Sequence, residues 1–200
     1  MSRIRDEADL TDAELADFPG LLAVSQFARM LREVPWFAAL GEPLDEREVN
    51  LAEDYLAGMG FAEAAIVLAA DWEEAEEAVR NPDWNTAFWE AEEQLRVALV
   101  TEACERADEA TVQLALTHLS NTAAQAIVDR AEIAAVHWEI ADEALLRTAI
   151  GAATQACYHA GLALAAESED EEQHPFAIKY RLFEAGRWPL GLVGASYYLF

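Results

Sequence analysis

Residues 148–166 read TAIGAATQACYHAGLALAA, a run that contains no Asp, Glu, Lys or Arg. Across the whole chain, 26% of the residues are charged. A helix at the surface of a protein keeps a charged or polar face toward water, so a helix without formal charge is usually surrounded by other protein. The run therefore predicts a central helix around which an α-helical domain packs.

The segments on either side of this run place apolar residues three or four positions apart, as amphipathic helices do. The chain has 9 Gly and 6 Pro, too few for a turn-rich β fold. We therefore predict an all-α fold, a single domain over residues 1–200 built as a helical bundle of about seven to nine helices. The last three long helices should form an antiparallel bundle. Helices are expected near 19–34, 45–58, 62–80, 84–106, 109–130, 133–144, 148–166 and 175–185.

The C-terminal tail, residues 174–200, differs in composition from the acidic helical body at 1–173. It carries three basic residues against one acid, and after a short helix it becomes aromatic and extended. No complementary strand is evident upstream, so we expect no sheet beyond a single pairing. The tail either folds back to complete the core or docks a partner. The docking candidates are Lys179, Arg181, Arg187 and Trp188.

The charge balance is strongly negative, with 38 acidic against 13 basic residues and a net charge of −25. A field of this sign repels nucleic acid phosphates and anionic lipid headgroups. We therefore expect neither nucleic acid nor membrane among the partners. An acidic, Ala-rich and Lys-poor composition is also typical of a GC-rich genome or a salty cytoplasm, so acidity alone assigns no function.

The cysteine content and the N-terminus indicate a soluble, cytoplasmic protein. Cys104 and Cys157 give no disulfide framework, and reduced thiols are the rule in a cytoplasm. The first residues lack the apolar segment of a signal peptide. The uncharged run at 148–166 is barely long enough to cross a bilayer and contains polar residues, which argues against a transmembrane helix.

Three histidines, His118, His137 and His159, fall on three successive predicted helices. Helical bundles build metal sites from inward side chains on facing helices. However, alanine stands three positions before each histidine, so the Glu-x-x-His pattern of di-iron proteins is absent. We therefore predict no metal site and no cofactor, and we interpret these residues first as core or surface histidines.

A row of small and polar residues runs along the central helix. Thr148, Ala152, Gln155 and His159 stand at positions i, i+4, i+7 and i+11, which share one helix face. Such a row must either form hydrogen bonds inside the core or line a cavity. The candidate ligand-binding residues are Thr148, Gln155, His159, His137 and His118.

Familiar catalytic and cofactor motifs are missing from the chain. There is no phosphate-binding Gly loop, Cys-x-x-Cys pair, nucleophile elbow or Asp-rich calcium loop, and no catalytic residue is predicted. The acidic surface and the aromatic tail favour a non-enzymatic interaction or accessory protein that self-associates, as a homodimer, or binds a protein partner. The alternative is a helical-bundle protein that binds a small ligand or a metal, or an enzyme, through the His and Gln residues of the last three long helices.

Overall fold

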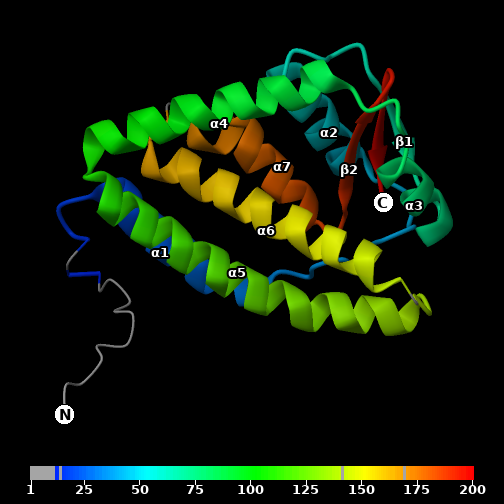
Figure 1. Ribbon diagram of the computed structural model, residues 1–200, viewed down its shortest axis with the longest axis horizontal. Coiled ribbons are helices and arrows are strands. Elements are labelled where there is room, and N and C mark those ends of the chain that lie inside the picture. Colours follow the sequence, from blue (N-terminus) through cyan, green and yellow to red (C-terminus); the bar gives the residue numbers. More distant parts are fainter. Residues whose placement is uncertain (1–11, 14, 141, 169) are drawn as a thin grey trace.

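The computed structural model describes residues 12, 13, 15–140, 142–168 and 170–200. These residues form seven α-helices, which pack beside a small three-stranded sheet at one end of the molecule (Figure 1). None of the helices in these ranges is long and apolar enough to cross a membrane. The helices are α1 (Pro19–Met30), α2 (Glu46–Gly58), α3 (Trp72–Val79), α4 (Thr86–Arg106), α5 (Glu109–His137), α6 (Glu143–Ala165) and α7 (Pro175–Glu184), with 3-10 turns η1 (Leu31–Glu33) and η2 (Glu171–Gln173). The strands are β1 (Ala65–Leu68), β2 (Pro189–Val193) and β3 (Ser196–Leu199).

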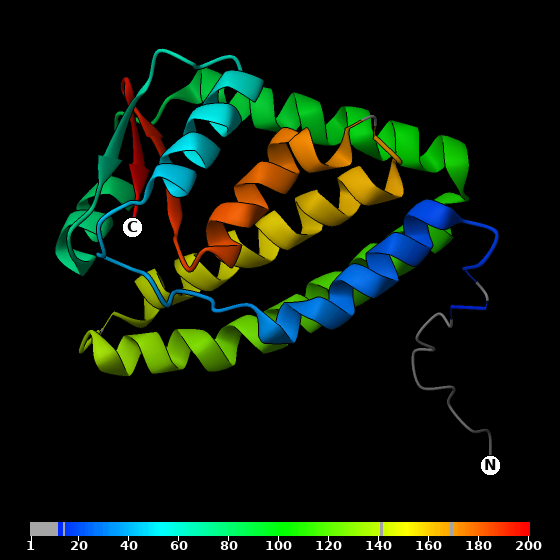
Figure 2. The same ribbon diagram turned by 180° about the vertical axis from the view of Figure 1, so that it is seen from behind.

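The central helix predicted from the uncharged run is α6. It packs against α1, α4, α5 and α7, and the two opposite views show it in the middle of the helical layer (Figures 1 and 2). The carboxylate of Asp142 caps its start by accepting hydrogen bonds from the amides of Ala144 and Leu145. A Cβ on Gly161 would lie 2.1 Å from a methyl of Leu119, so α5 and α6 approach closely where the sequence places a small residue.

The helices that were expected at 109–130 and 133–144 are one continuous helix, α5. The sequence between 130 and 137 contains neither Gly nor Pro, so nothing in the backbone stops the helix there. It ends at the C-cap Trp138, and Glu139 follows with a positive φ of 53°. The expected bundle of three consecutive helices at the end of the chain is therefore replaced by the antiparallel pair of α5 and α6 (Figure 1).

The all-α prediction is wrong at the sheet, although the fold is mostly helical as predicted. The expected helix at 62–80 is instead strand β1 followed by α3. Strand β1 pairs in parallel with β3, with Ile66 opposite Tyr197, and β2 pairs antiparallel with β3. A short apolar run does not distinguish a buried strand from a helix segment. The parallel partner of β1 is β3, which lies far along the chain. No local sequence pattern therefore predicts the pairing.

The C-terminal tail folds back and closes the core. The amide of Trp188 donates to the carbonyl of Phe200 at 2.6 Å, and the amide of Phe200 donates back at 2.9 Å. The indole of Trp188 is 1% exposed and lies 5.5 Å from that of Trp72, measured between ring centroids. The prediction of an extended tail is confirmed, since its last residues form β2 and β3.

Two hydrophobic clusters meet between α4 and the sheet. The larger cluster surrounds α6, and the smaller one joins α2 and α7 to the sheet through residues such as Tyr55, Phe88 and Tyr197. Phe88 and Tyr197 each pack against the ring of Tyr55, with centroids 5.9 and 5.7 Å away. The candidate site lies along this boundary.

Candidate functional site

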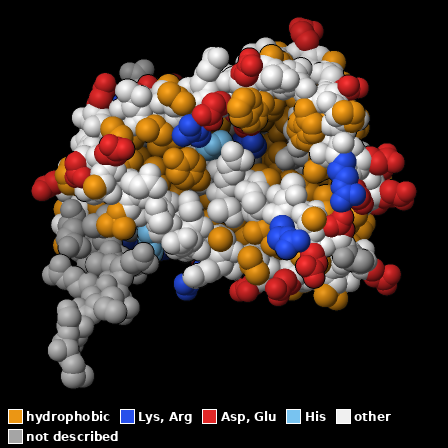
Figure 3. All heavy atoms as spheres, viewed as in Figure 1, with side chains coloured by type: hydrophobic (Ala, Val, Ile, Leu, Met, Phe, Trp, Pro, Cys, Tyr) orange, Lys and Arg blue, Asp and Glu red, His pale blue; other side chains and the backbone are white. Residues whose placement is uncertain are grey.

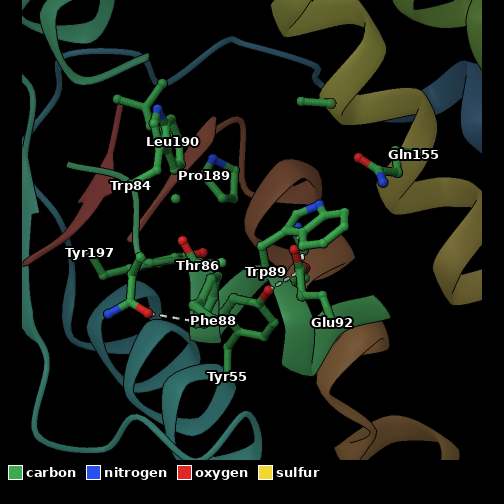
Figure 4. Close-up of a pocket in the computed structure, with 14 residues that line it drawn as sticks. Tyr55, Trp84, Thr86, Phe88, Trp89, Glu92, Gln155, Pro189, Leu190 and Tyr197 are labelled. Carbon is green, nitrogen blue, oxygen red and sulfur yellow. Dashed lines mark hydrogen bonds and ion pairs between the residues drawn. The ribbon is translucent and has the colours of Figure 1, made fainter. Parts of the chain in front are cut away.

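A pocket of about 410 Å³ opens between α4, α6 and the sheet, and we call it the aromatic pocket. Its volume is within the range of about 300–1,000 Å³ that is usual for small-molecule sites. Trp84, Pro189 and Leu190 lie on one side of it, while Gln155 on α6 lies across the pocket from them (Figure 4). The lining residues are Tyr55, Trp84, Asn85, Thr86, Phe88, Trp89, Glu92, Ala152, Gln155, Lys179, Pro189, Leu190, Gly191 and Tyr197.

Local sequence fixes the first turn of α4 at the mouth of the pocket. The side-chain oxygen of Asn85 accepts the amide of Phe88 at 3.0 Å, and its side-chain nitrogen donates to the carbonyl of Gly194 at 3.0 Å. The N-cap is therefore tied to the β2–β3 turn. One turn into the helix, Trp89 is 64% exposed at the pocket, so its ring is accessible from solvent.

The ring of the second tryptophan, Trp84, packs against the backbone at Gly191. Gly191 on β2 has a φ of +123°, and a Cβ there would lie 2.3 Å from the Trp84 ring. The indole nitrogen of Trp84 donates to the carbonyl of Val79 at 3.3 Å. The missing side chain at Gly191 therefore lets the indole pack directly on the sheet backbone.

An ion pair lies at the base of the pocket. The ammonium Nζ of Lys179 on α7 is 2.5 Å from Oε1 of Glu92 on α4, and the hydroxyl of Tyr55 on α2 donates to the same oxygen at 2.6 Å. The two charged side chains are only 15% and 16% exposed. Oε2 of Glu92 accepts no hydrogen bond from any described residue, so it is available to a ligand.

The base of the pocket keeps fixed charges. Burial opposes ionisation of Glu92, but the charge and hydrogen bond of Lys179, together with the hydrogen bond from Tyr55, hold the pKa of Glu92 below its usual range. Burial and the neighbouring Glu92 carboxylate raise the pKa of Tyr55 well above its usual value. A general acid or base works best with a pKa near the working pH. The pKa values of Glu92 and Tyr55 are both shifted away from pH 7. Neither group is therefore suited to proton transfer near neutral pH, whereas both can take part in binding.

Two buried polar side chains near the ion pair have no hydrogen-bond partner among the described residues. One is Tyr197, which lines the pocket but whose hydroxyl is buried, and the other is His159, in which neither ring nitrogen has a partner in the described part of the chain. The two residues are 1% and 2% exposed. Buried polar groups are nearly always paired, so each such group calls for an explanation.

His159 lies one helical turn beyond Gln155, on the protein side of the pocket. Its ring stacks on Phe176 with centroids 4.2 Å apart and an interplanar angle of 17°. Burial lowers its pKa to about 4, helped by the positive charge of Lys179. The ring is therefore neutral at physiological pH and offers one donor and one acceptor.

The polar row predicted on the central helix is divided by the structure. Ala152 and Gln155 line the aromatic pocket, and His159 is buried behind it. Thr148 is exposed outside the pocket, where its hydroxyl donates to the carbonyl of Ala144 at 3.0 Å.

The other two histidines lie on α5, away from the pocket lining. His137 is exposed at the end of that helix against Trp138, and His118 is half-buried near its middle. Within the described part of the chain, no three His, Cys, Asp or Glu side chains are grouped as metal ligands.

The four predicted docking residues do not form one surface. Lys179 belongs to the aromatic pocket, and Arg181 borders a separate, shallow acidic hollow beside α2. Arg187 is 2% exposed and makes two 2.9 Å contacts with the Glu48 carboxylate, while Trp188 is in the core. Neither Arg187 nor Trp188 reaches the surface, because the tail carries both inside.

Sequence reasoning missed Tyr55, Trp84, Trp89 and Glu92. The nearest local signal is on α4, where Glu92 shares a helix face with Phe88 and Leu95. An acid on an apolar face requires a partner, but the partner is on a helix 87 positions away. Nothing local names Lys179 as that partner.

Comparison with known proteins gives no guide to the role of this pocket. No protein-family model, no curated protein and no solved structure matches the chain.

Proposed function

We propose that the protein binds a small organic molecule in the aromatic pocket. The observation that carries this proposal is the ion pair of Glu92 and Lys179 at the base of an open pocket, beside the unpartnered hydroxyl of Tyr197. Ligand sites are typically apolar hollows with a few convergent polar groups. If the Glu92–Lys179 ion pair served stability alone, it would not require an open pocket with aromatic walls and the exposed ring of Trp89 at its mouth.

Binding rather than catalysis is the function that this chemistry supports best. Glu92 is ionised, and the shifted pKa values of Tyr55 and His159 leave both groups neutral near pH 7. These groups supply hydrogen bonds and charge but no proton-transfer group near neutrality. We also propose a cytoplasmic location, which would keep Cys104 and Cys157 as thiols, and no nucleic acid or membrane partner, for which the net charge of −25 is the support.

The test is a fragment screen followed by a blocking substitution. Ala152→Trp places an indole in the pocket from α6, and Thr148→Trp places the same indole one turn away, outside the pocket lining. Fragments that raise the melting temperature of the wild type should still do so with Thr148→Trp and should fail with Ala152→Trp. If no fragment binds the wild type, or if both variants respond like it, the proposal is wrong.

A second candidate function is self-association, and a neutral face on α5 favours it. Residues 111–128 contain no charged side chain in a protein with a net charge of −25. Part of this stretch is exposed, and Leu114 is 41% exposed. Most of the side chains over the middle of α5 are neither acidic nor basic (Figure 3). We define the α5 face by its exposed residues Gln113, Leu114, Thr117, Asn121 and Gln125.

We propose that a second copy of this chain is the occupant of the α5 face. A basic partner would dock where the acids are dense, whereas two copies that each carry −25 can meet only where charge is absent. Sedimentation velocity at tens of micromolar protein should show a dimer. Asn121→Glu should dissociate it, while Gln94→Glu, on an exposed position of α4, should not. A monomeric wild type would overturn this candidate.

A further inference from the structure

We infer that the ligand of the aromatic pocket is an uncharged, flat heteroaromatic molecule of the nucleobase or nucleoside class, without a phosphate. This inference rests on the proposed function and specifies its ligand chemistry. It follows from the walls of the pocket, from the hydrogen-bonding groups at its base and from the balance of charge there.

The walls are built from aromatic rings. Phe88 contacts Tyr55, Phe61 and Tyr197 through ring pairs with centroids 5.2–6.0 Å apart, so the inner wall is a rigid aromatic cluster. Trp84 and Trp89 extend this surface to the mouth, where they are 41% and 64% exposed. Aromatic side chains with accessible faces bind flat ring systems by stacking, largely independently of which base is stacked.

The base of the pocket offers donors and acceptors side by side. Oε2 of Glu92 can accept a hydrogen bond, and the ammonium of Lys179 can donate one. The amide of Gln155, which faces the pocket from α6, can do both (Figure 4). Adjacent donors and acceptors of this kind match the edge of a nucleobase, which carries both within one plane.

The balance of charge selects a neutral ligand. Glu92 and Lys179 compensate each other at 2.5 Å, so an added cation or anion would leave an unpaired charge in a site where both side chains are about 15% exposed. A phosphate would also meet the field of a chain with a net charge of −25. The base or nucleoside is therefore favoured over the nucleotide.

The experiment is isothermal titration calorimetry with adenosine, guanosine, cytidine and uridine. Two comparison ligands are titrated beside every nucleoside. The comparison ligands are the corresponding 5′-monophosphate, which adds charge, and tryptamine, which is flat and cationic. At least one nucleoside should bind, and its monophosphate should bind at least about tenfold more weakly. A monophosphate that binds as tightly as its nucleoside overturns the inference.

Variants of pocket residues test whether the nucleoside binds in the aromatic pocket. Trp89→Ala, at an exposed position, should weaken nucleoside binding about tenfold through lost stacking. Glu92→Gln should weaken it by a similar factor, whereas Glu93→Gln, which removes the neighbouring carboxylate, should not change it. If tryptamine binds in a manner sensitive to Ala152→Trp and no nucleoside binds, the ligand class is wrong while the pocket function stands. If neither binds, the ligand class is wrong, and the fragment screen with Ala152→Trp decides separately whether the pocket binds a small molecule.

Discussion

The ammonium of Lys179 on α7 lies 2.5 Å from the carboxylate of Glu92 on α4, and among the described residues no other ion pair joins these two helices. The hydroxyl of Tyr55 shares the same carboxylate oxygen at 2.6 Å. Three elements are thus joined at one oxygen atom at the base of the aromatic pocket. The space-filling view shows acidic, basic and histidine side chains together in a hollow bordered by hydrophobic ones (Figure 3).

Removing the charge of Glu92 should destabilise the protein. In Glu92→Gln, Lys179 keeps its charge in a mostly buried position without a carboxylate, which should cost about 2 kcal/mol of unfolding free energy. Glu93→Gln is the matched control, because Glu93 pairs with Arg96 at a far more exposed position and its loss should be much smaller. Urea denaturation measures both. Equal losses in the two variants would show that the Glu92 pair contributes no more than a surface pair.

The free energy of unfolding should decrease as the pH is lowered, because of His159. Burial lowers the pKa of the folded-state ring to about 4, whereas an unfolded histidine takes up its proton near pH 6.5. The unfolded state therefore binds more protons between these values, so this contribution is fully present above about pH 6.5 and is lost as the pH falls toward 4. The loss at about pH 5 should be roughly 2 kcal/mol. Urea denaturation above pH 6.5 and at about pH 5 should show that His159→Phe removes this part of the pH dependence. An unchanged dependence in the variant would contradict the assignment.

The buried ion pair of the tail should be essential for folding stability. Arg187 contacts both Glu48 oxygens and donates to the carbonyls of Ala39, Glu42 and Pro43. Arg187→Met should cost about 4 kcal/mol, because it leaves a buried carboxylate and several carbonyls without partners.

The control for this prediction is Arg80→Met. Arg80 pairs with Glu76 and Asp142, but its side chain is 57% exposed, so the loss should be below about 1 kcal/mol. Chemical denaturation compares the two variants. A small loss for Arg187→Met would mean that the tail is not anchored by this contact.

Gly191 should be required for the position of Trp84. Gly191→Ala adds a Cβ at 2.3 Å from the Trp84 ring, at a φ of +123° that L residues rarely adopt. Gly60→Ala is the matched control, because its φ is also positive, at +84°, but no atom lies within 4 Å of the added Cβ. The melting temperature should fall for both and further for Gly191→Ala, and only Gly191→Ala should change the near-ultraviolet circular dichroism of tryptophan. Identical spectra would contradict the proposed packing.

The helices could be predicted where their signals are local. The uncharged run identified α6 and its central place, and Asp45 and Glu48 form the capping box that starts α2, as their spacing indicates. The start of α3 carried the same kind of signal, since Asp71 accepts the amide of Glu74 three positions later. The apolar run before Asp71 also fits a longer helix, so this spacing alone does not separate β1 from α3.

The sheet and the pocket could not be predicted because they depend on distant pairings. Strand β1 is four residues long and finds its parallel partner at the other end of the chain. The polar row on α6 left two alternatives, a hydrogen-bonded core and a lined cavity, and one member of the row, Gln155, lies in the aromatic pocket. The groups that give that pocket its chemistry, Tyr55 and Glu92, come from α2 and α4, and only the tertiary fold brings them to Lys179.

The most direct test of ligand binding in the aromatic pocket is fluorine NMR of protein labelled with 5-fluorotryptophan. The chain has six tryptophans, of which Trp84 and Trp89 line the pocket and the other four do not. Titration with the nucleoside that binds in calorimetry should shift the resonances of these two and leave those of Trp36 and Trp138 in place, with no shift in Ala152→Trp. Unmoved Trp84 and Trp89 resonances at saturating ligand, or equal shifts at all six tryptophans, would contradict binding at this site.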